Sequence, residues 1–302
     1  MRIAHISDLH LNPDYFPERT EALYHILEKC RTLAVDHIVI TGDITNQAKA
    51  KEFEHARSIL KEFDLLDPAK LTMTIGNHDI YGGPYHAEDV LSFPGFCKGT
   101  DYDSKVKEFY STFHESFEDC KYVSGTSIFP FVKIIGDIAF VGINSVAQWS
   151  SLKNPIGSNG DIGKHQYQQL KKIFASEILK GKTILVLIHH HFNKIEKKKS
   201  AGKLERLWHT IEMSTMKLWK KKRLFQLFND GNVEKVLHGH LHSHDYYKRK
   251  NINFLNAGGT IFKNSHGNHS FHLLDTHRKS IEHTTISVSV SKHFNMSLVN
   301  TQ

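Results

Sequence analysis

Five short apolar runs in this 302-residue chain are each followed at once by residues that could bind a metal ion. The residues after these runs are almost all Asp, Asn, His and Gly: Ser7–His10, Thr41–Asp43, Gly76–Asp79, His189–His191 and His238–His242. Carboxylate oxygen, amide oxygen and imidazole nitrogen together suit Mn, Fe or Zn, and no thiolate accompanies them. The pattern predicts a metal site assembled from distant stretches.

The spacing within these stretches also favours metal binding. In Asp8-x-His10 and His240-x-His242, two side chains can leave an extended segment toward the same side. The neighbouring glycines permit the tight turns that aim such ligands. Two cations held about 3.5–4 Å apart need a bridging carboxylate, and Asp43, which stands between the other pairs, is the natural choice.

Strands and helices must bring these stretches together. The sequence predicts strands at Ile3–Ile6, His37–Ile40 and Leu71–Ile75, alternating with helices at Arg19–Leu33 and Ala48–Phe63. This alternation indicates right-handed crossovers and a largely parallel sheet. In open α/β sheets, ligands bind outside the carboxyl ends of the strands, which is where the polar stretches fall.

The second half of the chain predicts another sheet. A hairpin is expected from Ile128–Ile135 and Ile138–Ile143, and further strands at Thr183–Ile188 and Val233–Leu237. Strands from His244 onward indicate an antiparallel half. We therefore expect an α/β protein with two sheets, the first mainly parallel and the second more antiparallel, and with helices outside them.

The ordered motifs resemble those of the calcineurin-like metallophosphoesterase superfamily. Its pattern is D-x-H, G-D, G-N-H-[DE], a histidine after a strand, and G-H-x-H, and the likeness runs from residue 1 to about 260. The chain is most similar to the cyclic-nucleotide phosphodiesterase (class III) branch, because of its compact motif spacing and of Gly160–Gln166 before a helix. The resemblance implies a four-layer α-β-β-α sandwich with two mixed sheets, the metallo-dependent phosphatase fold.

The resemblance also implies two sets of ligands for two divalent metal ions (Mn, Fe or Zn). One cation would be held by Asp8, His10, Asp43 and His242. The other would be held by Asp43, Asn77, His189 and His240. His189 is the expected ligand because it comes first after its strand, and His190 is the alternative if the strand ends one residue later.

Other residues beside these ligands have implied or open roles. His78 is similar to the family's catalytic histidine, which lies near the leaving group and binds no metal. Asp79 could orient His78 or only cap the turn. Asn46 lies near a strand end and could touch a phosphate, although asparagine is also common in turns.

The implied activity is hydrolysis of phosphodiester or related phosphate ester bonds by a hydroxide that bridges the two metals. His78 would act as a general acid. No serine nucleophile elbow and no P-loop motif is present, which disfavours serine hydrolase and P-loop nucleotide chemistry. The alternatives are a nucleotide-lipid pyrophosphate hydrolase or a nuclease. A scaffold without enzymatic activity is disfavoured because every ligand position is intact.

The positive charge of the chain is concentrated in one segment. Between Lys194 and Arg223 there are eleven Lys or Arg and three Asp or Glu, whereas the whole chain carries a formal net charge of +7. We expect one phosphoesterase domain at 1–290, with a basic, cap-like insert at about 192–228 and a tail at 291–302. The insert could steer an anionic phosphate-ester substrate or touch a membrane surface or lipid. No dedicated protein partner is implied.

The remaining features indicate a cytoplasmic protein. No run approaches the ~20 apolar residues of a membrane span, and the N-terminus lacks a signal-peptide apolar region. The three cysteines are odd in number and widely spaced, so they make a poor disulfide framework. Histidines outside the motifs, such as His244, His272 and His283, are expected in the core or on the surface.

Overall fold

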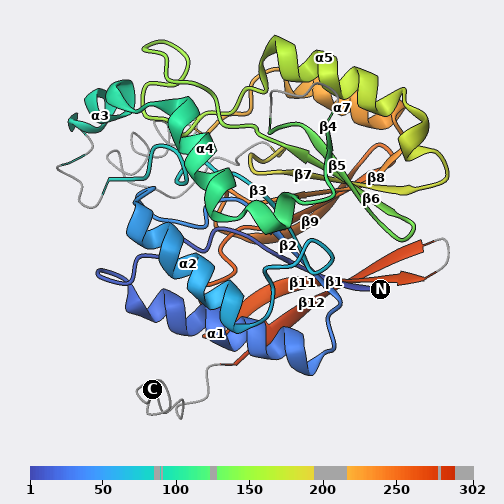
Figure 1. The fold of residues 1–302 in the computed structure, drawn as a ribbon, viewed down its shortest axis with the longest axis horizontal. Helices are drawn as coiled ribbons and strands as arrows, with labels where there is room; N and C mark the ends of the chain where they lie inside the picture. The colour runs from blue at the N-terminus through green and yellow to red at the C-terminus, as the bar shows by residue number, and fades with distance from the viewer. Residues whose placement is uncertain (85–88, 90, 123–127, 194–215, 278–279, 290–302) are drawn as a thin grey trace.

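The first sheet combines strands from both ends of the chain (Figure 1). Its order is β12-β11-β1-β2-β3. Strands β1 (Arg2–Ile6), β2 (His37–Thr41) and β3 (Leu71–Thr74) are parallel, and β11 (His269–His277) and β12 (Ser280–Val288) are antiparallel. Because β1, β2 and β3 run in the same direction, their carboxyl ends lie at one edge of the sheet.

The second sheet has seven strands in the order β4-β5-β6-β7-β8-β10-β9. Its parallel centre consists of β6, β7, β8 and β10, while β4, β5 and β9 pair antiparallel at its edges. The bounds are Lys121–Tyr122 for β4, Phe131–Ile135 for β5, Ile138–Ile143 for β6, Thr183–Ile188 for β7, Val233–His238 for β8, His244–Arg249 for β9 and Ile252–Ala257 for β10.

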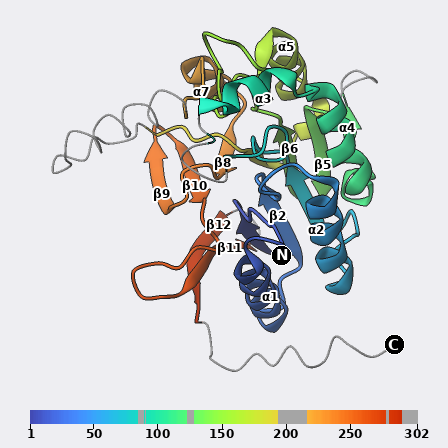
Figure 2. The same cartoon turned by 90° about the vertical axis from the view of Figure 1, so that its left-hand side faces the viewer.

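The expected antiparallel half after His244 is wrong in its detail. The last four strands are divided between the sheets: β9 and β10 extend the second, and β11 and β12 extend the first (Figure 2). In addition, β10 runs parallel to β8. Periodicity shows that a segment is a strand, but it does not show which partner that strand takes, so both sheets are mixed.

Alternating side chains on the strands create separate apolar layers. In β7, Leu185 and Leu187 pack between the two sheets, whereas Val186 packs on the outer face. In β2, Val39 likewise lies between the sheets while Ile38 contacts the helical side. Both faces of these central strands are therefore buried, which explains why their sequences are continuous apolar runs.

Helices cover the outer face of each sheet (Figures 1 and 2). Helices α1 (Pro17–Thr32) and α2 (Ala50–Glu62) pack on the first sheet, and α5 (Gly163–Phe174) and α7 (Lys221–Asp230) pack on the second. The other helices in the described residues are α3 (Phe93–Gly99), α4 (Tyr102–Thr112), η2 (His114–Phe117) and η3 (Glu177–Leu179). The four-layer α-β-β-α prediction with two mixed sheets is confirmed.

This computed structural model describes residues 1–84, 89, 91–122, 128–193, 216–277 and 280–289. Residues 194–215, which form most of the basic insert, and the tail at 291–302 lie outside this range. At the described end of the insert, Leu224 and Phe228 of α7 are buried in the core beside α5. None of the described helices is both long and apolar enough to cross a membrane.

Candidate dinuclear metal centre

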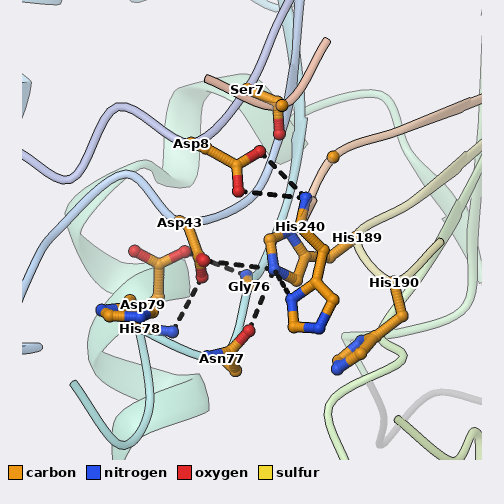
Figure 3. Close-up of polar contacts among 12 residues, drawn as sticks. Ser7, Asp8, Asp43, Gly76, Asn77, His78, Asp79, His189, His190 and His240 are labelled. Carbon is orange, nitrogen blue, oxygen red and sulfur yellow. Dashed lines mark hydrogen bonds and ion pairs between the residues drawn. The ribbon is translucent and has the colours of Figure 1, made fainter. Parts of the chain in front are cut away.

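The polar stretches that follow the central strands of both sheets converge on one site (Figure 3). Asp8, Asp43 and Asn77 follow β1, β2 and β3 of the first sheet, and His189 and His240 follow β7 and β8 of the second. All five residues are at most 4% exposed. The site therefore lies where the carboxyl ends of two stacked sheets meet.

One group of converging ligand atoms comes from four residues. Asp8, His10, Asp43 and His242 each offer an atom within 4.8 Å of all the others. The His10 Nε2 atom lies 2.9 Å from His242 Nε2 and 3.7 Å from Asp43 Oδ2. The side chain of His242 is 47% exposed, whereas the other three are buried. This group is thus open to solvent at His242.

A second group shares Asp43 with the first. Asp43, His189 and His240 also place ligand atoms within 4.8 Å of one another. The His189 Nε2 atom lies 3.2 Å from Asp43 Oδ2, 3.2 Å from His240 Nδ1 and 3.0 Å from Asn77 Oδ1. One carboxylate therefore stands between two sets of donors, which is the geometry that a bridging ligand requires.

Unusual backbone conformations aim these side chains. Asp8, His10, Asp43 and His240 all have positive φ, between 43° and 77°. For residues other than glycine, this left-handed conformation costs of order 1–3 kcal/mol and persists only where the surroundings hold it. Strain at four neighbouring candidate ligands indicates a constraint on this site beyond folding.

Two glycines are required by close packing around the carboxylates. A Cβ at Gly76 would overlap Asp43 Oδ1, and a Cβ at Gly239 would overlap Asp8 Oδ2. Atoms that are not bonded do not approach so closely, so any other residue would displace a carboxylate. These glycines let the backbone run directly past the two acidic side chains.

Backbone groups fix the orientation of the candidate ligands. The His240 N–H donates to the Asp8 carboxylate at 3.0 Å, and the His78 N–H donates to Asp43 Oδ1 at 2.8 Å. The His189 Nδ1–H donates to the Thr41 carbonyl at 2.9 Å. Because that carbonyl can only accept, Nδ1 keeps its proton, and Nε2 is the ring nitrogen that faces Asp43.

The electrostatics of the site favour a bound cation. Burial disfavours charge on the His189 ring, but Asp43 and Asp8 outweigh it and raise its pKa to about 9. Burial likewise opposes the Asp43 charge, yet His189 and the neighbouring histidines keep its pKa well below the usual range. Burial raises the pKa of Asp8. Two buried carboxylates facing imidazole lone pairs are a donor set that fits two divalent cations.

His78 lies at the side of this centre. Its ring meets the His10 ring edge-on at 4.4 Å between centroids, and the side chain is partly exposed. Its Nδ1–H donates to the Asn46 carbonyl at 2.9 Å. Asn46 therefore contacts His78 through its backbone, while its side-chain oxygen accepts a hydrogen bond from Arg19.

Asp79 caps the turn through hydrogen bonds to three backbone N–H groups. Its Oδ1 accepts hydrogen bonds from the backbone N–H groups of Ile44 and Thr45, and its Oδ2 accepts one from Gly76 N–H. Burial and the Asp43 charge outweigh these hydrogen bonds and raise the pKa of Asp79 to about 7. The geometry therefore favours capping of the turn over orientation of the His78 ring as the role of Asp79.

Both ring nitrogens of His190 contact serine residues and not Asp43. Its Nδ1 is 2.8 Å from Ser145 Oγ, and its Nε2–H donates to the Ser158 carbonyl at 3.2 Å. Burial, together with the neighbouring His189, lowers the pKa of His190 to about 3. Between the two adjacent histidines, only His189 presents a nitrogen to the shared carboxylate.

Sequence reasoning missed one residue beside the site. Arg19, in the first turn of α1, donates to the His10 carbonyl at 2.9 Å and to Asn46 Oδ1 at 3.0 Å. No motif contains Arg19, and it is separated from its partners by 9 and 27 residues. Only the packing of α1 against the loop after β1 reveals it.

Comparisons with known proteins give one family and several similar folds. The model of the calcineurin-like phosphoesterase family matches residues 1–244. A dimetal phosphatase from Danio rerio has a similar structure, with a TM-score of 0.56 at 13% identity over 96% of this chain and 99% of that chain. A purple acid phosphatase from yellow lupin (Lupinus luteus) seeds gives a TM-score of 0.56 at 14% identity, over 91% of this chain and 49% of that chain.

A third similar structure is GAP50, the anchor in the inner membrane complex of Plasmodium. Its TM-score is 0.52 at 12% identity, over 97% of this chain and 89% of that chain. At such low identity these likenesses show a shared fold. No curated protein sequence matches the chain.

Proposed function

The chain belongs to the calcineurin-like phosphoesterase family, and on that premise we propose that it hydrolyses phosphodiesters with two divalent cations that share Asp43. The observation that carries the proposal is the position of Asp43, whose carboxylate completes both groups of converging ligand atoms. A structural ion pair would need only one such group. Two groups joined by one carboxylate are what a two-metal hydrolytic site requires.

The proposed ligands follow from the two groups. Asp8, His10, Asp43 and His242 would hold one cation, and Asp43, Asn77, His189 and His240 would hold the other. When bound, such a pair neutralises the charge of the phosphoryl oxygens and lowers the pKa of water from about 15.7 toward 7. The buried residues keep the pair fixed, while the exposed His242 leaves one side accessible to substrate.

His78 is proposed as the general acid. Its Nδ1 proton is committed to the Asn46 carbonyl, so Nε2 is the atom left to exchange a proton with the leaving group. Its edge-on contact with the His10 ring places it beside a ligand of the first cation. A departing alkoxide is a strong base, and a proton delivered to it lowers the barrier to its departure.

The basic segment between Lys194 and Arg223 supports an anionic substrate. Its net charge of +8, from eleven basic and three acidic residues, would raise the local concentration of phosphate esters. This steering depends on ionic strength, whereas the chemistry at Asp43 does not. Added salt should therefore lower kcat/KM more than kcat.

The proposal is tested with bis-p-nitrophenyl phosphate and p-nitrophenyl phosphate after the purified protein is stripped of metal and reloaded with Mn²⁺. We expect faster hydrolysis of the diester, loss of activity on chelation, and its return with Mn²⁺. Asp137→Ala, at a 93% exposed side chain, is a matched control for Asp43→Ala. No hydrolysis with any divalent cation, or equal rates for the metal-free protein, would contradict the proposal.

A further inference from the structure

Arg19 is a partly buried cation next to the candidate metal centre, and in the part of the chain that the structure describes it forms no direct ion pair. Its guanidinium stacks on the Phe16 ring at 3.7 Å and faces the Phe262 ring at 5.6 Å. Burial lowers the pKa of Arg19, the charges of Glu18 and Glu52 oppose this shift, and the guanidinium stays charged. The guanidinium is therefore held in place by hydrogen bonds and ring contacts and not by a direct ion pair.

One nitrogen of Arg19 joins the two functional parts of the site. The Nη1 group donates both to the His10 carbonyl and to Asn46 Oδ1. His10 is a candidate ligand with a left-handed φ of 43°, so the first bond braces a strained loop. Asn46 is the residue whose carbonyl accepts the His78 Nδ1 proton. The guanidinium therefore connects a candidate metal ligand to the support of the proposed general acid.

The His78 ring has little freedom around this support. A Cβ at Gly83 would overlap His78 Cε1, so the backbone closes against one edge of the ring. The His10 ring closes against it at 4.4 Å between centroids. Gly83 and the His10 ring thus restrict the His78 ring on two sides. The hydrogen bond to the Asn46 carbonyl then sets the rotation of the His78 ring and the direction of its Nε2 atom.

We propose that Arg19 is a positioning residue that holds His78 Nε2 toward the leaving group by fixing Asn46 against the His10 loop. The inference rests on the proposed function, because it concerns the leaving group of that reaction. In this role, removing Arg19 slows only the hydrolysis of esters whose leaving group requires a proton. A guanidinium that bound the substrate directly would act on all esters alike.

The catalytic test compares leaving groups of different basicity. Aryl esters of thymidine 5′-monophosphate are hydrolysed by wild type and Arg19→Ala, from the p-nitrophenyl to the unsubstituted phenyl ester. Since general acid catalysis contributes about 10²–10⁴-fold, we expect kcat to fall ~10–100-fold for the phenyl ester and to change little for the p-nitrophenyl ester. Arg19→Lys, which retains a donor, should recover part of the loss.

A double-mutant cycle separates positioning from substrate binding. In the His78→Ala background, Arg19→Ala should change the phenyl ester rate by less than about twofold, because there is no acid left to position. An equal rise in KM for every ester, retained in the His78→Ala background, would overturn the proposal. Loss of bound Mn²⁺ from Arg19→Ala would overturn it as well, because the role would then be support of His10.

Arg57→Ala is the matched control for removing a partly buried arginine. Arg57 donates to the Thr112 carbonyl and pairs with Glu115, away from the metal centre. This variant should lose stability but keep the wild-type dependence on leaving group. The same dependence in Arg57→Ala as in Arg19→Ala would show a general effect of destabilisation and overturn the proposal.

A readout without turnover keeps this inference separate from the proposed function. In ¹⁵N-histidine-labelled, metal-free protein, the His78 Nδ1–H signal is identified by its loss in His78→Ala. We expect slow exchange of this proton with water in wild type and at least ~10-fold faster exchange in Arg19→Ala, as the Asn46 acceptor loosens. Unchanged exchange would overturn the role of Arg19 even in an active phosphodiesterase, whereas inactivity of the wild type would refute the proposed function alone.

Discussion

Two groups of closely packed imidazoles occupy different places in this molecule. One is the candidate metal centre, where the His10 and His242 rings lie 4.7 Å apart and the His189 and His240 rings lie 5.0 Å apart. The other, the inter-sheet cluster, consists of His5, His244, His272 and His283. There the His244 and His272 rings lie 4.6 Å apart and the His5 and His272 rings 6.0 Å apart.

The difference between them is the presence of carboxylates. Asp8 and Asp43 lie among the histidines of the centre, and despite burial they raise the pKa of His189 to about 9. In the inter-sheet cluster, burial lowers the pKa of His272 to about 3 and that of His244 to about 4. Among the described residues, metal-capable groups of three or more occur only at the centre. Imidazoles alone pack as neutral rings, and buried carboxylates turn them into a site for cations.

The largest expected effect is that of Asp43→Ala. Removing the shared carboxylate should release both cations and lower the hydrolysis of bis-p-nitrophenyl phosphate by at least ~10³-fold, because both sets of ligands lose a member. Metal content by mass spectrometry and the diester assay measure this. The exposed control Asp137→Ala should keep two ions and full activity. If Asp43→Ala retained both ions and full activity, carboxylates would not explain the difference between the two groups of imidazoles.

The next effect separates the two adjacent histidines. His189→Ala should lose one of the two bound ions and about 10²–10³-fold in rate, since His189 alone presents a nitrogen to Asp43. His190→Ala should keep both ions, because its contacts are with Ser145 and Ser158. The number of metal ions bound by each variant shows which of the two histidines is a ligand. Loss of an ion from His190→Ala only would reverse the assignment.

His78→Ala should have a smaller and more selective effect. We expect kcat to fall about 10²-fold for an ester with a basic leaving group, while both ions stay bound, because the His78 ring belongs to neither group of converging ligand atoms. Kinetics and metal analysis on the same preparation measure the two parts separately. An emptied site would show that His78 is a ligand.

The sequence indicates which polar stretches converge better than it indicates how the strands pair. Each ligand stretch, such as Gly76–Asp79, is local and follows a strand whose end is visible in the pattern. The pairing of β10 with β8, and of β11 with β1, depends on contacts between segments far apart in the chain. Apolar periodicity carries no signal for such contacts.

The same limit applies around the centre. Arg19 and the Asn46 carbonyl act through backbone contacts that no residue pattern records. The role of Asp79 as a cap depends on three N–H groups converging in the folded loops. The inter-sheet cluster was also beyond prediction. Its histidines on β1, β11 and β12 become neighbours only when the two ends of the chain pair in the first sheet, and His244 joins them from β9 of the second sheet.

The inter-sheet cluster should affect stability rather than catalysis. In the folded state the pKa of His272 is about 3, against 6.5 ordinarily, so below pH 6.5 the unfolded chain takes up the proton first. Stability is therefore full above pH 6.5 and falls toward pH 3. Chemical denaturation of metal-free protein at pH 7 and pH 4 should show a loss about 3 kcal/mol greater in wild type than in His272→Phe. Equal losses would refute this role.

The smallest effect is expected when His272→Phe is assayed at neutral pH. His272 bonds to the Asn256 carbonyl and to Thr285, and no hydrogen bond joins it to a candidate ligand among the described residues. Metal content should stay at two ions, and kcat for the diester should change by less than about twofold. A larger fall in either quantity would mean that the two groups of imidazoles are coupled, and the contrast drawn between them would not hold.

The most direct test of a shared carboxylate is the magnetic coupling of the bound metals. Wild-type protein is loaded with Mn²⁺, its ions are counted by mass spectrometry, and its electron paramagnetic resonance spectrum is recorded. Two ions bridged at about 3.5–4 Å should give two Mn²⁺ per chain and an exchange-coupled spectrum. One ion per chain, or two ions with the spectrum of isolated Mn²⁺, would contradict the account.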